Sequence, residues 1–384
     1  MPSTADFNDN QIYTGIDPQD LTIFEKYRNP AACPTPGFYT DFMGVRTRLS
    51  YFGVKDTHFG ESVGEIPFPS DGLHAEAVEY VAALYAVDTS APSSFTAVEL
   101  GAGYGPWLAF SAKAAQHKGV KKINVIAVEG DRPRLALLRT HFEDNGLPVP
   151  DQSGSGVLGD VRSKLVHGAI SDTNGTVTFG SQSVHDWGAA PVENGEAVDY
   201  RGLEISGEAV DSYTIEHVIR DLPSVDFLHM DIQGFEARAV RASLDALLSK
   251  VRVMLIATHS RQIEGELFEM LFGHGWRIFC EKPCKFARKE ANNLVALTTV
   301  DGTQVWVNTA LDEQRKSLEA LGTVKAQTSQ HELNVALERT QSLERKLEQA
   351  NESIAALRRE VAALRDSTSW KVTAPLRKLR SVIH

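Results

Sequence analysis

The chain has 384 residues, more than one average domain needs, and its hydrophobic fraction of 42% is that of an ordinary soluble protein with a core. Its formal net charge of -11 argues against a general nucleic-acid binder. Three cysteines are too few for a disulfide framework, which fits a reducing cytoplasm. The N-terminus shows no signal peptide, and no apolar run approaches the ~20 residues of a membrane span. These features predict a cytoplasmic protein.

Residues 1–71 are rich in Pro, Gly and aromatic residues without a sustained period, which predicts an irregular N-terminal cap. From 72 to 310, apolar strand-like runs alternate with amphipathic helix-like segments. This alternation predicts an α/β domain with a seven-stranded, mainly parallel sheet and helices on both faces. The expected strands contain Thr96–Leu100, Ile123–Val128, Leu165–Ile170, Val225–Met230, Val251–Ala257, Arg277–Cys280 and Thr303–Val307. The expected helices include Pro133–Asn145, Phe235–Leu248 and Gln262–His274.

Residues 311–366 contain no Pro and a single Gly, and from Leu333 they follow a heptad repeat. Five unbroken heptads predict a coiled coil and therefore a homo-oligomer, a dimer or a trimer. A single amphipathic helix folded back on the rest of the chain is the alternative. One core position is occupied by Leu333, Thr340, Leu347, Ile354 and Val361, and the other by Ala336, Leu343, Ala350, Leu357 and Leu364. In a parallel pair, Arg339 would face Glu344 of a partner, and Glu360 would face Arg365.

Residues 367–384 form a short basic tail that carries four Lys or Arg residues and no acid. Its apolar residues include Trp370. Such a segment could lie on an anionic membrane surface or dock on a partner, and a frayed terminus is the simpler alternative.

A glycine-rich loop, VELGAGYGPW from Val98 to Trp107, directly follows an expected strand and precedes an expected helix. Glycine permits positive φ and leaves room for a ligand, and the helix N-terminus offers amides to a polar group. The spacing of Gly101, Gly103 and Gly105 is G-x-G-x-G, so the G-x-G-x-x-G pattern of dinucleotide-binding folds is not met.

The next expected strand ends in Glu129, whose two carboxylate oxygens suit the cis-diol of a ribose. Such an acid occurs in both NAD and S-adenosylmethionine sites, so Glu129 by itself does not discriminate between them. The glycine spacing favours S-adenosylmethionine, whose amino-acid end Glu99 could contact.

Four ordered motifs together resemble the FkbM family of S-adenosylmethionine-dependent methyltransferases over roughly residues 78 to 310. They are ELGAGYG, Glu129, HGAISDTNGTVTF (167–179) and FLHMDIQGFE (227–236). That family commonly reads Lys-Ile-Asp-Val-Glu-Gly-x-Glu where this chain has His229 to Glu236, with His229 for the Lys and Gln233 for the first Glu. The resemblance implies a Rossmann-like class I methyltransferase fold. It also implies that Ser171 and Asp172 lie near the adenine, and that a loop with His185, Asp186, Trp187 and Gly188 covers the adenine or the substrate.

Methyl transfer to a hydroxyl needs an aligned acceptor and a group that takes its proton. The candidates follow the fourth and fifth expected strands, where open α/β sheets bind ligands. Asp231 is the first choice as base, with His259 as helper or alternative base and His229 on the same strand face. Asp231 and Glu236 could instead hold a divalent ion, but no metal is predicted.

FkbM-like enzymes methylate hydroxyls, many on sugars or polyketides, and the tail resembles the ends of many bacterial proteins of surface-polysaccharide assembly. The resemblance therefore implies a sugar or glycan acceptor in polysaccharide biosynthesis, with a peripheral contact at the inner face of the membrane or in an assembly. Two alternatives stay open: an O-methyltransferase for small natural products, and a non-catalytic coiled-coil interaction protein on a methyltransferase fold.

Overall fold

The computed structural model describes residues 14–53, 63–64, 75–179, 183–192, 204, 207–288, 291 and 293–373, without the side chains of 318–333 and 335–336. It divides the chain into two units, Met1–Lys316 and Ser317–His384. The expected irregular segment 1–71 and the tail 367–384 lie partly outside the described residues.

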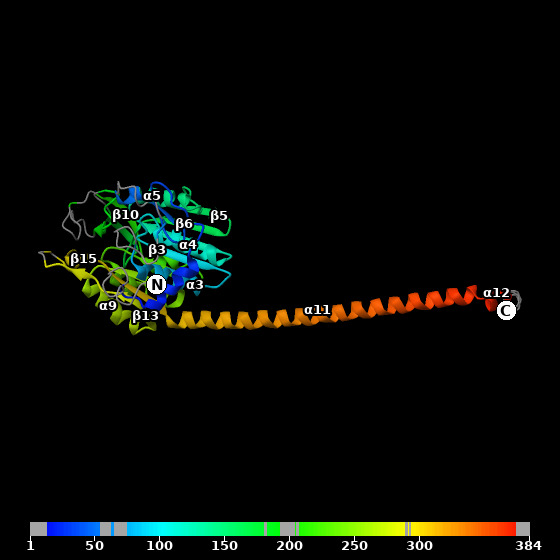
Figure 1. Ribbon diagram of the computed structural model, residues 1–384. Helices are drawn as coiled ribbons and strands as arrows, with labels where there is room; N and C mark the ends of the chain where they lie inside the picture. Colours follow the sequence, from blue (N-terminus) through cyan, green and yellow to red (C-terminus); the bar gives the residue numbers. More distant parts are fainter. Residues whose placement is uncertain are drawn as a thin grey trace. The chain divides into compact units, whose positions relative to one another are not determined.

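An eight-stranded mixed sheet forms the centre of the first unit (Figure 1). The five strands from β12 to β6 run parallel to their neighbours, whereas β16 is antiparallel to β12 and to β13, and β5 is antiparallel to β6. In spatial order the strands are β13 (Trp276–Lys282), β16 (Gly302–Asn308), β12 (Val251–Thr258), β11 (Val225–Met230), β3 (Phe95–Leu100), β4 (Ile123–Glu129), β6 (Val161–His167) and β5 (Ser155–Leu158).

The expected α/β fold with helices on both faces is confirmed, but the expected count of seven strands is wrong. The additional strand, β5, lies at the sheet edge, where Val157 and Leu158 are largely exposed. Because an exposed edge strand buries few side chains, it produces no apolar run in the sequence. The expected strand Leu165–Ile170 is divided at Gly168, where β6 ends and β7 (Ala169–Ile170) enters another sheet.

Two buried cores lie on opposite faces of the sheet because alternate strand residues point to opposite sides. Ala97 and Val125 belong to one core, and their neighbours Val98 and Ile126 belong to the other. The first core packs against α3 (Ala77–Asp88), α4 (Pro106–Lys118) and α5 (Arg132–Asp144). The second packs against α6 (Ile215–Ile219), α7 (Glu236–Ala242), α8 (Leu244–Lys250) and α9 (Arg261–Phe272).

The single helix expected over Phe235–Leu248 is instead two helices, α7 and α8, that meet at Ser243. The Ser243 backbone leaves helical geometry at φ -125° and ψ 16°. Its hydroxyl accepts a hydrogen bond from the Glu216 amide at 3.1 Å, which gives the side chain a partner outside the helix. Serine favours such local alternatives to a continuous helix.

A smaller four-stranded sheet lies beside the main one and contributes to the cavity described below. Two short ribbons and further short elements complete the first unit. The smaller sheet has the order β7, β10 (Glu208–Tyr213), β8 (Gly175–Phe179) and β9 (Pro191–Val192). The ribbons pair β1 (Phe38–Thr40) with β2 (Arg46–Arg48), and β14 (Lys285–Phe286) with β15 (Thr298–Val300). The short helical elements are η2 (Pro18–Leu21), α2 (Thr22–Tyr27), η3 (Leu49–Phe52) and α10 (Leu294–Leu297).

The described part of the N-terminal region packs onto the same core as α3 and α4. Phe24 and Phe42 are buried there, and their rings meet edge to face at 5.4 Å. Phe42 also contacts Phe110 of α4 at 5.9 Å. This region is therefore anchored to the domain by aromatic packing, which contributes beyond the area it buries.

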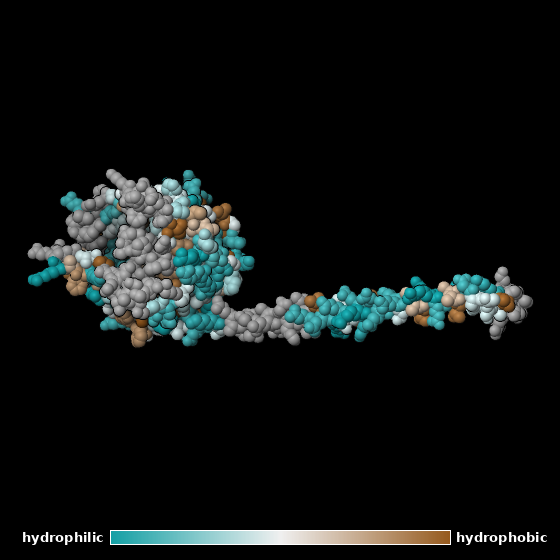
Figure 2. Space-filling model, in the orientation of Figure 1, coloured by the Kyte–Doolittle hydropathy of each residue, from teal (hydrophilic) through white to brown (hydrophobic). Residues whose placement is uncertain are grey.

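The long helix α11 (Thr309–Asp366) is continuous through the segment expected to form a coiled coil, and α12 (Thr368–Val372) follows it. Leu343, Leu347, Ile354, Leu357 and Leu364 on α11 are between 48% and 64% exposed within the chain. Figure 2 shows apolar residues among the hydrophilic ones along the C-terminal part of α11. Among the helices that the structure describes, none is long and apolar enough to cross a membrane.

Candidate active site

The glycine loop after β3 is held against two neighbouring strands. The amides of Gly101 and Ala102 donate to the carbonyl of Val128 at 3.0 and 2.9 Å, and the Asp231 amide donates to the carbonyl of Leu100 at 3.0 Å. The loop therefore starts from a fixed position at the carboxyl ends of β3, β4 and β11, where open α/β sheets bind ligands.

Each of the three glycines has positive φ, but each serves a different purpose. A Cβ on Gly101 (φ 74°) would lie 1.9 Å from the carbonyl oxygen of Asp231. One on Gly105 (φ 74°) would meet Leu138 at 3.2 Å. A Cβ on Gly103 (φ 55°) would approach the ring of Trp187 on the aromatic side of the cavity, at 3.3 Å. Gly101 and Gly105 therefore leave room mainly for other parts of the protein, and Gly103 borders the space for a ligand.

The carboxyl group of Glu99 caps the helix that follows the loop. Glu99 is buried and accepts hydrogen bonds from the amides of Trp107 at 3.4 Å and Leu108 at 3.2 Å. The amides at the start of α4 that were expected to meet a polar ligand thus already have a partner. Burial raises the pKa of Glu99 well above its usual value, although these two hydrogen bonds oppose the shift.

The side chain of Glu129, at the end of β4, binds the backbone of the glycine loop. One of its oxygens accepts from the Gly103 amide and the other from the Asp131 amide, both at 2.7 Å. Burial raises the pKa of Glu129, and the positive charge of Arg134 opposes the shift. Each carboxylate oxygen has a second lone pair. Glu129 therefore keeps acceptor capacity for a pair of hydroxyls beside Gly103.

These residues line one cavity of about 260 Å³ at the carboxyl end of the sheet. It gathers residues from the main sheet, the smaller sheet and the N-terminal region. Four carboxyl groups lie along it, those of Glu79, Glu99, Glu129 and Asp231. Of the predicted site residues, it brings together Glu99, Gly101, Gly103, Glu129, Trp187, His229 and Asp231.

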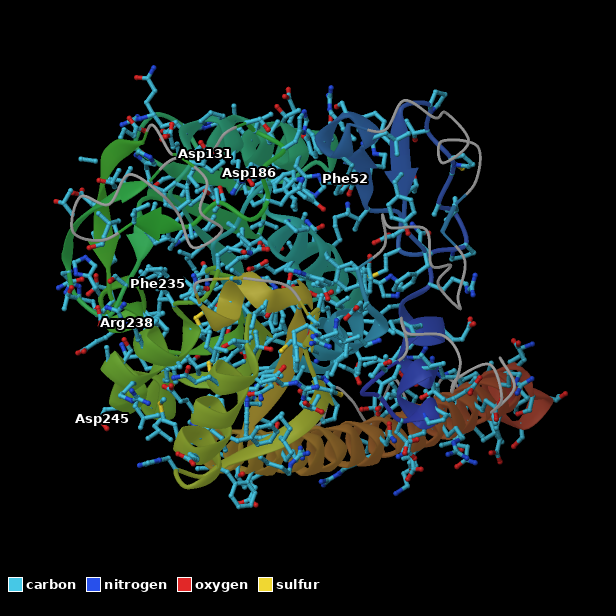
Figure 3. All side chains as sticks on the ribbon, turned by 90° about the vertical axis from the view of Figure 1, so that its left-hand side faces the viewer. Phe52, Asp131, Asp186, Phe235, Arg238 and Asp245 are labelled. Atoms are coloured by element: carbon cyan, nitrogen blue, oxygen red, sulfur yellow. The ribbon has the colours of Figure 1, made fainter. Side chains whose placement is uncertain are left out.

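An aromatic wall closes one side of the cavity. The ring of Trp187 lies 5.6 Å from that of Tyr104 and 6.4 Å from that of Phe52. The Arg134 guanidinium lies 5.0 Å from the Trp187 ring and donates to the carbonyl of Asp186. Figure 3 shows Asp186 beside Asp131, and Arg134 contacts both of them. The loop with Trp187 is thereby fixed over the cavity by stacking and by a cation–π contact.

Asp231 lies at the end of β11 with a side chain that is 38% exposed and lines the cavity. Its Oδ1 accepts a hydrogen bond from Nε2 of Gln233 at 2.8 Å and lies 3.4 Å from Nε2 of His259. Burial raises the pKa of Asp231 to about 6, while the neighbouring His259 acts to lower it. Asp231 can therefore change protonation state close to neutral pH, as a general base must.

His259 is buried between carboxyl groups and does not line the cavity. Burial by itself would lower the pKa of His259, but the carboxyl groups of Glu236, Asp231 and Asp301 outweigh it and raise this pKa to about 10. The imidazole is then protonated at neutral pH and cannot accept another proton. A protonated imidazole would act as a charge partner of Asp231, while the prediction of His259 as an alternative base stays a prediction.

His229 lines the cavity from the same strand as Asp231 but is in a different electrostatic state. Burial lowers the pKa of His229 to about 3, so the ring is neutral. Its Nδ1 lies 3.6 Å from Oε1 of Glu99, and its ring lies 5.8 Å from that of Trp107. His229 is therefore packed between the capping carboxyl and the start of α4.

Three residues expected at the cofactor make other contacts. Ser171 and Asp172 line a separate surface depression instead of the cavity, and Asp172 forms an ion pair with Arg238 at 3.0 Å. In Figure 3, Arg238 lies beside Phe235, consistent with a guanidinium-to-ring distance of 5.3 Å. His185 contacts the carbonyl of Tyr51 through Nδ1 at 2.9 Å.

Several lining residues escaped the sequence-based selection, among them Glu79 and Gln233. Glu79 of α3 reaches the cavity, and burial raises its pKa to about 8. Gln233 has φ 55°, a strained conformation for a residue other than glycine, and lines the cavity while it bonds Asp231. Strained backbone of this kind clusters at functional sites. The departure from the family pattern at Gln233 was the signal available in the sequence, whereas nothing marked Glu79.

A second cavity, of about 230 Å³, adjoins the first and shares Phe52, Tyr104, Pro106 and Trp107 with it. Its other walls come from β1, β2, α3, α4 and α5. They include the aromatic residues Tyr39, Tyr80 and Phe110 and the buried polar residues Asp41, Thr47 and His141.

Comparisons with known proteins place this site in a family. Residues 99–286 match the family model described as Methyltransferase FkbM domain. A curated protein of Jannaschia sp. (strain CCS1), named "Putative methyltransferase", is 31% identical over 259 residues, which are 66% of this chain and 86% of that protein.

Solved structures of low similarity include methyltransferase FkbM of Methylobacillus flagellatus KT, with 16% identity, a TM-score of 0.33 and coverage of 55% of this chain and 43% of that one. A SAM-dependent O-methyltransferase of Thermotoga maritima has 12% identity, a TM-score of 0.31 and coverage of 62% and 66%. Because the family model covers the glycine loop, Glu129 and the Asp231 segment, and the curated relative is matched over most of its length, the chain belongs to the FkbM family and is an S-adenosylmethionine-dependent methyltransferase.

Proposed function

We propose that the enzyme transfers a methyl group from S-adenosylmethionine to a hydroxyl group of a sugar, with Asp231 as the proton acceptor. One observation carries the proposal: Asp231, a carboxyl group with a pKa of about 6, lines the same cavity as the glycine loop and Glu129. A sugar hydroxyl has a high pKa, so its attack gains from a base aligned beside it.

The residues of the cavity fit S-adenosylmethionine. The cofactor carries a sulfonium and an ammonium group, and four carboxyl groups line the cavity. Glu129 would accept the ribose hydroxyls, and the apolar wall with Trp187 and Ile170 would cover the adenine. The positive charges of the bound cofactor would lower the raised pKa values of Glu99 and Glu79, which would then pair with those charges. When bound, the cofactor supplies an electrophilic methyl group on a good leaving group.

The aromatic cavity beside the cofactor cavity supports a sugar acceptor. Tyr39, Tyr80 and Phe110 offer ring faces, and Thr47 offers a hydroxyl for hydrogen bonding. Amphipathic aromatic walls with a few placed polar groups suit a ring that has apolar C–H faces and polar edges. Because Trp107 borders both cavities, an acceptor in the second would lie next to the cofactor in the first.

The cofactor assignment predicts a defined loss of binding when Glu129 is replaced by alanine. Truncation removes the acceptor for the ribose hydroxyls and also leaves the buried amides of Gly103 and Asp131 without their partner. We expect micromolar binding of S-adenosylmethionine and S-adenosylhomocysteine by the wild type, and a loss of about tenfold or more in the variant. Calorimetric titration of both proteins measures this, with NAD as the control ligand. Equal affinity in the variant would remove Glu129 from the binding site.

The acceptor class is tested by methyl transfer from labelled S-adenosylmethionine to two panels of acceptors. One contains nucleotide sugars and oligosaccharide fragments, and the other contains non-carbohydrate alcohols and phenols. We expect the label in a sugar methyl ether. Label only in the second panel would favour the small-molecule alternative and reject the sugar proposal. A protein that binds the cofactor and labels neither panel would also contradict it.

We further propose that α11 forms a parallel coiled coil with a second copy of the chain, within a polysaccharide-assembly system. Support comes from the heptad repeat and from the exposure of its leucines in the single chain. The Ser367 hydroxyl caps α12, and Trp370 is 43% exposed. Most of the basic tail lies outside the described residues, so its contact with a membrane or partner stays a prediction.

Lysine at Ile354 and Leu357 together is expected to convert the oligomer to a monomer. Both residues occupy core positions of the heptad repeat. Burying two lysine charges per chain between the helices costs more free energy than the remaining apolar contacts of the core provide. Sedimentation equilibrium at micromolar concentration measures the mass. Leu337→Lys is the matched control, because Leu337 is equally exposed at 57% but lies outside the two core positions. A monomeric wild type would contradict the proposal.

A further inference from the structure

Glu236 is a buried carboxyl group that the proposed reaction has not yet used. It lies in the first turn of α7 with no exposed surface. Its Oε1 accepts the Gly234 amide at 2.9 Å and lies 2.9 Å from Nδ1 of His259. Its Oε2 is buried without a hydrogen-bond partner. A carboxylate buried this completely needs a positive partner, and His259 is placed to be that partner.

The other ring nitrogen of His259 lies close to Asp231, which lines the cavity. Nε2 of His259 lies 3.4 Å from Oδ1 of Asp231, so one ring connects a carboxyl with no exposed surface to one that lines the cavity. Glu236 fixes the ring through Nδ1, and Nε2, which is buried without a hydrogen-bond partner, lies at ion-pair distance from Asp231. This arrangement resembles the way in which a buried acid orients a catalytic histidine in hydrolases.

We propose that Glu236 is a positioning residue for methyl transfer: it holds His259 as an imidazolium beside Asp231 and thereby keeps Asp231 ionised as the proton acceptor. This inference rests on the proposed function of Asp231 as base. Glu236 acts only through His259, because it has no exposed surface and does not line the cavity.

The other charged groups around the pair explain why a cation is needed there. Asp301, in the turn between β15 and β16, has Oδ2 at 3.9 Å from Nε2 of His259 and is 59% exposed. Asp301 and Glu236 both act to raise the pKa of Asp231. Two further lining carboxyl groups, Glu79 and Glu99, are close enough for Asp231 to raise their pKa values. Of the charged groups that shift the pKa of Asp231, His259 is the one with a positive charge, and it lowers this pKa.

The proton and electron pairs balance without any further reactant. The acceptor hydroxyl gives its proton to the Asp231 carboxylate as its oxygen forms a bond to the methyl carbon. The carbon–sulfur bond breaks, and its electron pair stays on the sulfur as a neutral thioether. His259 keeps its proton throughout and stabilises Asp231 before the transfer.

The charge state of His259 can be measured without cofactor or acceptor. The full-length protein is labelled at histidine, and the His259 ring signal, assigned with a His259→Gln variant, is followed by NMR from pH 5 to 9. We expect a wild-type imidazolium throughout this range. In Glu236→Gln, the amide oxygen can still accept from Nδ1 but carries no charge. Because Glu236 is the largest of the carboxyl contributions that oppose burial, the pKa of His259 should fall and the ring should lose its proton within this pH range. A neutral wild-type ring at pH 7, or an unchanged ring in the variant, would overturn the proposal.

Glu264→Gln is the matched control, since Glu264 is a buried carboxyl with different partners. It bonds the Thr258 hydroxyl at 3.1 Å and the Cys284 amide at 2.6 Å. If loss of a buried carboxyl only loosened the fold, both variants would change alike. We expect the His259 titration to move in Glu236→Gln alone.

The pH profile of kcat/KM then tests the effect on the reaction. Loss of the imidazolium raises the pKa of Asp231 by more than loss of the Glu236 charge lowers it, because the ring has the larger effect on Asp231. We therefore expect the acidic limb to move to higher pH by about one unit or more in Glu236→Gln. A merely structural role would lower the rate at every pH without moving the limb. The NMR result stands without any methylated acceptor, so it separates failure of this inference from failure of the sugar assignment.

Discussion

Asparagine in place of Asp231 is expected to lower kcat/KM for methyl transfer by about 10²- to 10⁴-fold, the usual contribution of a general base. Asparagine keeps the shape of the side chain but cannot take the hydroxyl proton. Cofactor affinity should stay close to that of the wild type, because the residues expected to hold the ribose and adenine lie on other strands and loops. Steady-state kinetics and calorimetric titration of the same preparation measure both quantities.

The pH dependence of the wild type provides a second readout of Asp231. The pKa of Asp231 is raised to about 6, and only the ionised form accepts a proton. The value of kcat/KM should therefore rise as the pH increases through about 6, and this limb should be absent from Asp231→Asn. Asp245→Asn, an exposed residue of α8, is the control. Full activity in Asp231→Asn would show that the base lies elsewhere.

Alanine at Gly101 is expected to abolish cofactor binding and to destabilise the first unit. The new Cβ would lie 1.9 Å from the Asp231 carbonyl oxygen, so the loop would have to separate from β11. The positive φ of 74° adds a conformational cost of about 1–2 kcal/mol. We expect a total loss above about 3 kcal/mol, because a backbone overlap adds to that cost. Denaturant unfolding and calorimetric titration measure the two effects.

Gly119 provides the matched control for that substitution. It caps α4 with φ 81°, and a Cβ there would meet nothing within 4 Å. Gly119→Ala should therefore lose only the conformational cost of about 1–2 kcal/mol and bind the cofactor normally. Equal losses in the two variants would mean that the close approach to Asp231 is unimportant.

The sequence predicted most of the sheet because its central strands are buried on both faces. Val98, Val125 and Leu228 are fully or almost fully buried, and such strands appear as continuous apolar runs. The edge strand β5 and the strands β8, β9 and β10 of the smaller sheet were not predicted, since exposed or very short strands leave no such run. The heptad repeat of α11 could be read directly, because helix periodicity is a local property of the chain.

The positions of Gly101, Glu129 and Asp231 in one cavity also followed from the sequence. Each comes at the end of an expected parallel strand, and the carboxyl ends of parallel strands meet at one edge of the sheet. The sequence could not show that Gly101 makes room for a carbonyl oxygen of β11, or that Glu99 occupies the amides of α4. Both depend on distances between segments that are far apart in the chain.

The sequence analysis put Asp231 first as base and His259 second, but it could not show how the two groups affect each other's charge. An isolated histidine is the better proton acceptor near neutral pH, and both residues follow central strands. Only the tertiary structure places Glu236, 23 residues earlier in the chain, at 2.9 Å from the His259 ring. A pKa depends on burial and on nearby charges, and these exist only in the folded chain. The sequence therefore determined the fold class and the edge of the sheet that holds the site, and the fold decided which group is charged there.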